Sequence, residues 1–155
     1  MIIIFEKIID GLAIWFGCGL SPKAPGTVGT LGAIPLLYLL SPLPVYYYMG
    51  ATLIFAVITI VVAHFYEAGG EHDSSEFVMD EVAGFLVTMA WVPFTWSGVL
   101  AGFILFRIFD IWKPFPISYI DKNMPGGVGT VADDLAAGIA ANIVLQLALQ
   151  NGVAL

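Results

Sequence analysis

Between Lys23 and Glu67 the chain reads APGTVGTLGAIPLLYLLSPLPVYYYMGATLIFAVITIVVAHFY (residues 24–66), without a single Asp, Glu, Lys or Arg. Residues 82–106 and 135–155 also lack these four residue types. A helix that crosses a bilayer needs about 20 apolar residues. The three stretches are therefore candidates for membrane-embedded helices, and buried core helices of a soluble bundle are the alternative interpretation.

The composition supports the first interpretation. The chain has 155 residues, the size of a single domain spanning 1–155. Of these residues 59% are hydrophobic and 11% charged, with a mean hydropathy of +0.94, whereas soluble domains carry about 25% charged residues. The net charge of −7 disfavours a nucleic-acid binder and suggests that a cation mediates any anion binding. The single Cys18 excludes an internal disulfide framework, and residues 8–18 carry Asp10 and no small-residue cleavage pattern, so no signal peptide is expected.

Proline-containing breaks at residues 41–44 and 93–98 divide the first two stretches, because proline removes a backbone donor and restricts the residue before it. The pattern predicts an all-α fold: a small multihelical membrane-embedded bundle with two helical hairpins, a final helix and an N-terminal amphipathic helix. The expected helical segments are Ile2–Phe16, Val28–Leu40, Val45–Ala63, Glu81–Val92, Val99–Lys113 and Asp133–Gln150.

The charged residues predict an orientation. All five cationic side chains lie in the same short stretches as the acids, and both breaks are uncharged. If each hairpin enters and returns, the charged stretches gather on one face, which the positive-inside rule makes cytoplasmic. A re-entrant hairpin, with arms that do not cross fully, is the alternative for either pair.

Two carboxylate pairs precede apolar sequence, Asp80-Glu81 and Asp133-Asp134. One acid is enough to cap a helix, the simplest role for such a residue. Adjacent acids at the mouth of an apolar helix repel each other and are desolvated, which a divalent cation would relieve. Mg²⁺ binds one or two carboxylates together with water and substrate phosphate. The two pairs are therefore candidate Mg²⁺ ligands.

Three further charges lie at intervals of three residues: Arg107, Asp110 and Lys113. This spacing places them on overlapping faces of one helix end. They are interpreted either as a phosphate clamp, in which Asp110 orients a cation or reaches the metal, or as interfacial ions whose side chains snorkel.

Two glycine-containing loops resemble each other, PGTVGT at residues 25–30 and PGGVGT at residues 125–130. Glycine lets backbone N–H groups approach an anion, and a helix N-terminus favours negative charge. Lys23 lies just before the first loop, so this loop is the candidate phosphate site. Its candidate binding residues are Gly26, Thr27, Gly29 and Thr30.

Other polar residues allow fewer conclusions. Asp134, Gly138, Asn142, Gln146 and Gln150 recur every four residues, so this side of the last helix is expected to face protein rather than lipid. His72 is a candidate proton donor to a leaving group, and a solvated loop histidine is the alternative.

Several motifs in collinear order resemble the phosphatidylglycerophosphatase A family. They cover residues 17 to 150 and are GLSPKAPGTVG at 19–29, His72-Asp73 with Asp80-Glu81, FRIFDIWKP at 106–114 with Pro116, Asp121 with GGVG at 126–129, and Asp133-Asp134 with Ala137-Gly138. Met124-Pro125 before the double glycine departs from the family pattern, although no chemical group is lost.

The resemblance implies an all-helical fold and Mg²⁺-dependent hydrolysis of phosphatidylglycerophosphate to phosphatidylglycerol and phosphate at the cytoplasmic face of the bacterial inner membrane. Glu81 and Asp134 would be the leading metal ligands, followed by Asp80, Asp133 and Asp110. Lys23, Arg107 and Lys113 would neutralise the phosphate, and a metal-activated water would attack it. A phosphatase for another lipid phosphate, such as phosphatidate, and a small ion-coupled transporter are the alternatives. The oligomeric state and the number of metal ions are left open.

Overall fold

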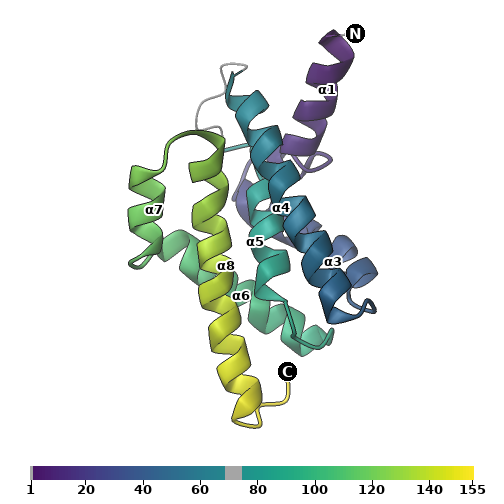
Figure 1. Ribbon diagram of the computed structural model, residues 1–155, viewed down its shortest axis with the longest axis vertical. Helices are drawn as coiled ribbons and strands as arrows, with labels where there is room; N and C mark the ends of the chain where they lie inside the picture. Colours follow the sequence, from purple (N-terminus) through teal and green to yellow (C-terminus); the bar gives the residue numbers. More distant parts are fainter. Residues whose placement is uncertain (1, 69–74) are drawn as a thin grey trace.

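The computed structural model describes residues 2–68 and 75–155, with side chains from Ile4 onward. The described residues form helices and no strand, which confirms the all-α prediction. Figure 1 shows α4 and α8 as the longest helices, with α5 beside them. The elements are α1 (Ile2–Ala13), the 3₁₀ helix η1 (Cys18–Leu20), α2 (Pro25–Gly32), α3 (Ile34–Leu40), α4 (Val45–Ala68), α5 (Met79–Thr88), α6 (Trp96–Trp112), α7 (Ile117–Asn123) and α8 (Gly126–Gln150).

The proline break at residues 41–44 lies where it was expected, between α3 and α4. The segment expected over Val28–Leu40 is in fact two helices that meet at Ala33. Pro35 lies in the first turn of α3, where its missing N–H costs no helical hydrogen bond. The short helix α7, directly after Pro114 and Pro116, was not predicted.

The last helix begins earlier than predicted, at Gly126 instead of Asp133. Its glycine-rich first turns are helical because they pack closely on α4: a Cβ at Gly127 would lie 2.6 Å from the backbone nitrogen of His64. Asp133 and Asp134 are consequently inside the helix. The capping interpretation is wrong for this pair.

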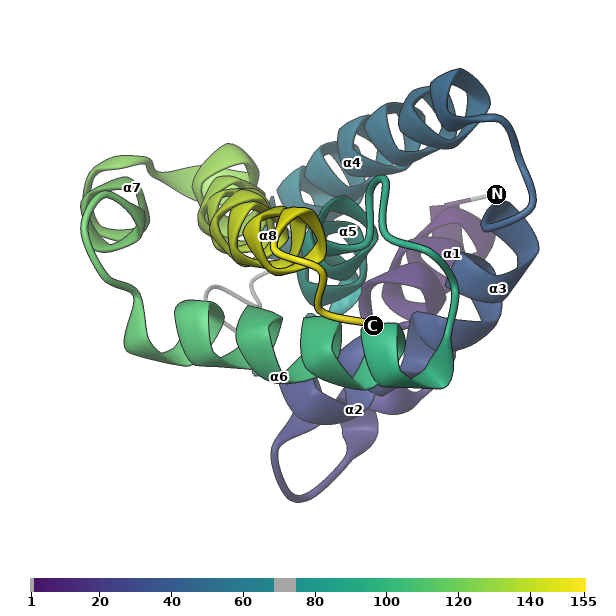
Figure 2. The same cartoon turned by 90° about the horizontal axis from the view of Figure 1, so that it is seen from below.

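The short helix α5 lies at the centre of the bundle, between α4, α6 and α8 in the view of Figure 2. Its Val82, Phe85 and Leu86 are fully buried, together with Phe106 of α6 and Leu145 of α8. α5 packs most extensively on α8 and less on α6, so the two arms of the second expected hairpin are not each other's main partners.

The contact between α5 and α8 depends on two glycines. A Cβ at Gly138 would lie 2.3 Å from the carbonyl oxygen of Gly84, and a Cβ at Gly84 would lie 2.6 Å from the carbonyl oxygen of Asp134. Such distances leave no room for a side chain, so the two backbones touch. Each glycine lies four residues after an acid, Asp80 on α5 and Asp134 on α8. The backbone contact therefore places these two acids next to each other.

The carbonyl end of α5 is buried in the bundle and is satisfied by side chains of α8. Asn142 Nδ2 donates to the carbonyl oxygens of Thr88, at 2.8 Å, and Ala90, at 2.7 Å, and Gln146 Nε2 donates to that of Ala90 at 3.0 Å. The expectation that the polar side of the last helix faces protein is confirmed for these two residues.

Two helices, α4 and α8, are long and apolar enough to cross a membrane by length and composition. The outer side of α4 exposes large aliphatic side chains, including Leu53, Ile54 and Val57. α8 does the same with Ile139, Ile143 and Leu147. Exposed apolar side chains on two neighbouring helices are typical of a surface that contacts a membrane or another protein.

We expect Gly138→Ala to destabilise the protein by about 1–3 kcal/mol, because the added methyl group overpacks the contact with α5. Gly50→Ala is the control, since a Cβ at Gly50 meets nothing within 4 Å. That substitution should leave the protein unchanged or stabilise α4 by roughly 0.5–1 kcal/mol. Thermal unfolding in detergent measures both effects, and equal stabilities of the two variants would contradict the proposed close contact.

Candidate active site

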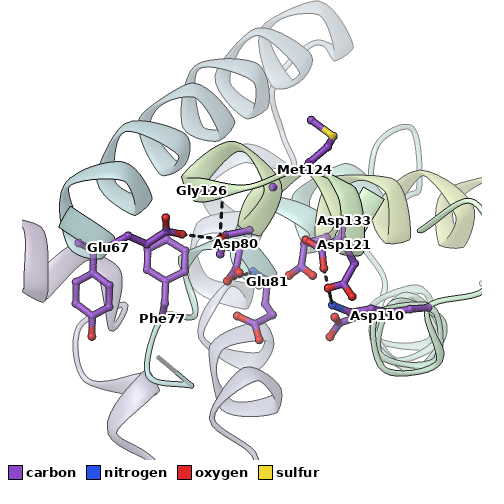
Figure 3. A pocket seen from close by; sticks show the side chains of 14 residues that line it. Glu67, Phe77, Asp80, Glu81, Asp110, Asp121, Met124, Gly126 and Asp133 are labelled. Atoms are coloured by element: carbon purple, nitrogen blue, oxygen red, sulfur yellow. Dashed lines mark hydrogen bonds and ion pairs between the residues drawn. The ribbon is translucent and has the colours of Figure 1, made fainter. Parts of the chain in front are cut away.

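Three carboxylates from two helices converge in the bundle. Asp80 and Glu81 lie in the first turn of α5, and Asp134 lies in the third turn of α8. One oxygen from each lies within 4.8 Å of the others. They line a cavity of about 520 Å³ at the end of the bundle where α4 ends and α8 begins (Figure 3).

Burial makes this arrangement costly without a cation. Asp134 is only 4% exposed. Glu81 Oε2 and Asp134 Oδ2 are buried and have no hydrogen-bond partner among residues 2–68 and 75–155. Burial raises the pKa of Asp80 well above its usual range, and the charges of Glu81 and Asp134 raise it further. Burial also raises the pKa of Glu81. Three converging carboxylates, two of which have a buried oxygen without a partner in the described residues, are suitable ligands for a hard divalent cation such as Mg²⁺.

Asp110 is near these acids but is held by Arg107. Arg107 Nη1 donates to Asp110 Oδ2, and the same nitrogen lies 3.7 Å from Glu81 Oε1. Asp110 lines the cavity, whereas Arg107 is not among its lining residues. In this structure the guanidinium group joins two acids of the site, so it is not directed at the cavity as a free phosphate clamp.

Asp133 and Lys113 form a second group on the same cavity wall. Lys113 Nζ donates to Asp133 Oδ2 at 2.6 Å and also to Asp121 Oδ1 on α7. Although burial lowers it, these hydrogen bonds raise the pKa of Lys113 above its usual range, so the ammonium stays charged. Asp133, expected as a metal ligand, is thus bound to Lys113 and is outside the group of three carboxylates.

The first glycine loop forms the helix α2 and lies outside the lining of the cavity. None of its predicted phosphate-binding residues lines the cavity: Lys23, Gly26, Thr27, Gly29 and Thr30. Thr30 Oγ1 donates to the carbonyl oxygen of Gly26, within its own helix. A Cβ at Gly26 would lie 2.0 Å from Glu81 Oε1 and 3.1 Å from Arg107 Nη1. This glycine therefore leaves the space that Glu81 and Arg107 occupy.

The second glycine loop, instead, contributes to the cavity wall. Gly126, Gly129 and Thr130 line it, and Thr130 Oγ1 donates to Glu67 Oε1 at 2.7 Å. Glu67 was not predicted as a site residue, nor were several other lining residues. The similarity of the two glycine loops indicated that either could contribute to the site, but it did not show which of them lines the cavity. The other lining residues that sequence reasoning missed are Tyr66, Phe77, Asp121 and Met124.

His72, the expected proton donor, lies outside the described residues.

The whole of residues 11–149 matches the family model of phosphatidylglycerophosphatase A. The chain belongs to the phosphatidylglycerophosphatase A family. Membership in this family makes it an enzyme, a phosphatase.

Individual relatives agree with this assignment. The phosphatidylglycerophosphatase A of Escherichia coli is 42% identical over 130 residues, which cover 83% of this chain and 76% of the relative. The Haemophilus influenzae protein of the same name is 41% identical over 137 residues, or 86% and 84% of the two chains. A putative phosphatidylinositol-3-phosphatase of Bacteroides thetaiotaomicron is 38% identical over 142 residues, or 86% and 88%. No solved structure is significantly similar to this chain.

We expect Asp80→Asn to change the stability of the metal-free and the Mg²⁺-loaded protein in opposite directions. Because the pKa of Asp80 is raised in the folded state, ionisation of this group destabilises the metal-free wild type as the pH rises above about 4. In chelator the variant should therefore lose less stability with rising pH than the wild type.

With Mg²⁺ at about 100 times its dissociation constant, the wild type should gain about 2.7 kcal/mol. Asp80→Asn should lose most of this gain, whereas the exposed control Asp10→Asn should keep it. Thermal unfolding with chelator or Mg²⁺ measures both effects. The same gain of stability with Mg²⁺ in Asp80→Asn and in wild type would contradict the interpretation of Asp80 as a metal ligand.

Proposed function

We propose that this chain hydrolyses phosphatidylglycerophosphate to phosphatidylglycerol and phosphate in a Mg²⁺-dependent reaction at the cytoplasmic face of the bacterial inner membrane. The observation that carries the proposal is the group of Asp80, Glu81 and Asp134, in which two buried carboxylate oxygens lack a hydrogen-bond partner among the described residues. Family membership supplies the substrate, because the relatives are named for this lipid phosphate.

Glu81 and Asp134, with Asp80, are the proposed Mg²⁺ ligands. Asp133 and Asp110 line the same cavity and are the next candidates. When bound, Mg²⁺ would lower the pKa of a water molecule and offset the negative charge of the phosphate. The chain's own residues have the remaining roles. Glu81 and Asp110 are held in place by Arg107, which restricts the directions in which their oxygens point.

Lys113 is the proposed phosphate-binding cation, since its ammonium group lies in the cavity wall. Lys23, Arg107 and the loop Gly26–Thr30 remain predicted phosphate contacts, which would require rearrangement of the loop or of the ion pairs of Arg107. His72 remains the predicted proton donor to the alkoxide leaving group.

The position of the cavity suits a lipid phosphate. It is lined from the C-terminal end of α4 and the N-terminal turns of α8, the two helices of membrane-spanning length. If both helices span the bilayer, the cavity lies at the level of the lipid headgroups, where the phosphate of the substrate is located. Figure 1 shows this end of α4 and α8 opposite the loop between α3 and α4.

A phosphatase for another lipid phosphate is the second candidate function. One relative with 38% identity is named a putative phosphatidylinositol-3-phosphatase, so the scaffold is compatible with a different headgroup. The transporter alternative is disfavoured because Asn142 and Gln146 use their amide groups to bind backbone carbonyls of α5 and its C-terminal turn.

Phosphate release from a panel of lipid phosphates in detergent tests the proposal. We expect wild type with Mg²⁺ to hydrolyse phosphatidylglycerophosphate faster than phosphatidate or phosphatidylinositol 3-phosphate, and chelator to abolish the activity. Glu81→Gln keeps the shape but removes the ligand charge, so turnover should fall by about 10²-fold or more. Glu6→Gln, an exposed substitution on α1, is the control and should retain activity. Full activity in chelator would overturn the metal-dependent mechanism, and a preference for phosphatidate would favour the second function.

The orientation has its own test, in a Cys18→Ser background that removes the single native cysteine. Leu43→Cys lies in the exposed α3–α4 loop and should react with an impermeant maleimide added to intact spheroplasts. Asn123→Cys is exposed at the end of α7, near the cavity, and should react only after permeabilisation. Labelling of Asn123→Cys in intact spheroplasts would contradict the proposed orientation.

A further inference from the structure

The cavity has an unusual charge balance for a site that would bind a phosphate. Among its described lining residues Lys113 is the single cation, and it is surrounded by acids. The acidic lining residues are Glu67, Asp80, Glu81, Asp110, Asp121, Asp133 and Asp134. The position of this one ammonium group therefore determines where the protein itself attracts an anion.

The backbone of Lys113 does not by itself determine where the ammonium group of this residue lies. Lys113 follows the last residue of α6 with a backbone φ of +45°, and its side chain is a flexible four-carbon stem. Two carboxylates from two other helices hold the ammonium: Asp133 on α8 and Asp121 on α7. The short helix α7 packs mainly on α8, so this ion pair connects three helices.

The two carboxylates differ in their surroundings. The side chain of Asp133 is 7% exposed, whereas that of Asp121 is 37% exposed. Asp133 Oδ1 is buried and lacks a hydrogen-bond partner among the described residues. This buried carboxylate attracts the ammonium group of Lys113 toward the protein interior. Asp121 binds the same ammonium from the more exposed side. Figure 3 shows Asp121 and Asp133 on one wall of the cavity, beside Asp110.

We propose that Asp121 is a positioning residue, which keeps the ammonium group of Lys113 at the cavity wall where it binds the phosphate of the substrate and of the product. The inference rests on the proposed phosphatase function and assigns a role to a residue that does not itself touch the substrate. It also assigns a role to α7, because this helix carries Asp121 to the ammonium group that Asp133 binds from α8.

Inorganic phosphate is the probe, since its binding in the presence of Mg²⁺ can be measured by thermal shift without turnover. Asp121→Asn removes the charge that holds Lys113, so the dissociation constant for phosphate should rise by about tenfold, the size of one charge-assisted hydrogen bond. KM for the lipid substrate should rise in parallel. Asp121→Glu keeps a carboxylate and should retain most of the affinity.

Lys122→Gln is the matched control, because Lys122 is the exposed neighbour of Asp121 on α7 and does not line the cavity. It should bind phosphate as the wild type does. If Asp121→Asn fails to fold, Asp121→Ser replaces it as the variant that removes the charge. A lower dissociation constant in the charge-removing variant would overturn the proposal, since Asp121 would then act by repelling phosphate.

A double-mutant cycle separates positioning from a direct or purely structural role. In a Lys113→Met background, Asp121→Asn should cause no further loss of phosphate affinity, because there is no ammonium left to position. Additive losses would overturn the proposal, and so would unchanged affinity in Lys113→Met alone. Failure of the proposed function looks different: the wild type would bind phosphate, with the coupling intact, but release none from any lipid phosphate.

Discussion

The geometry of the three-carboxylate group depends on the backbone contact between Gly84 and Gly138. Because neither residue has a side chain, α5 and α8 approach closely enough for their backbones to touch. Asp80 and Asp134 each lie one helical turn before one of these glycines, and Glu81 follows Asp80. The carboxylates therefore come together as a consequence of helix packing. A larger residue at either glycine would separate the helices, and the acids with them.

This geometry brings many acidic side chains together, and two cationic side chains, Arg107 and Lys113, offset part of their charge. Arg107 joins Asp110 to Glu81, and Lys113 joins Asp121 to Asp133. Arg107 thereby links α6 to α5 through Glu81, and Lys113 links the end of α6 to α7 and α8. Glu81 Oε2 and Asp134 Oδ2 still lack a partner in the described part of the chain, which a divalent cation would supply. The site thus combines acids that are paired with Arg107 or Lys113 and carboxylate oxygens that have no partner in the described residues, and Glu81 has one oxygen of each kind.

Buried polar groups need hydrogen-bond partners, and this requirement also explains how the C-terminal end of α5 is packed. α5 ends at Thr88 inside the protein, where its last carbonyl oxygens would be unsatisfied. From α8, Asn142 donates to the carbonyl oxygen of Thr88, and Asn142 and Gln146 both donate to that of Ala90 in the following turn. The short central helix is therefore held by α8 at two places, through the glycine contact at its middle and through amide hydrogen bonds at its C-terminal end. Apolar side chains of α4 and α8 are left to face outward.

The sequence by itself determined the helical class, the proline break at residues 41–44 and the three acids that converge, Asp80, Glu81 and Asp134, as candidate metal ligands. Hydropathy, proline stereochemistry and charge are local properties of the chain. The sequence also indicated that the polar side of the last helix faces protein. It did not determine the start of α8, since the helical conformation of the loop at residues 126–130 depends on packing against α4. Nor did it show which of two similar glycine loops lines the cavity, or that Lys113 binds Asp121 and Asp133. These features depend on contacts between residues far apart in the chain, such as Glu67 with Thr130, and only the tertiary structure brings such residues together.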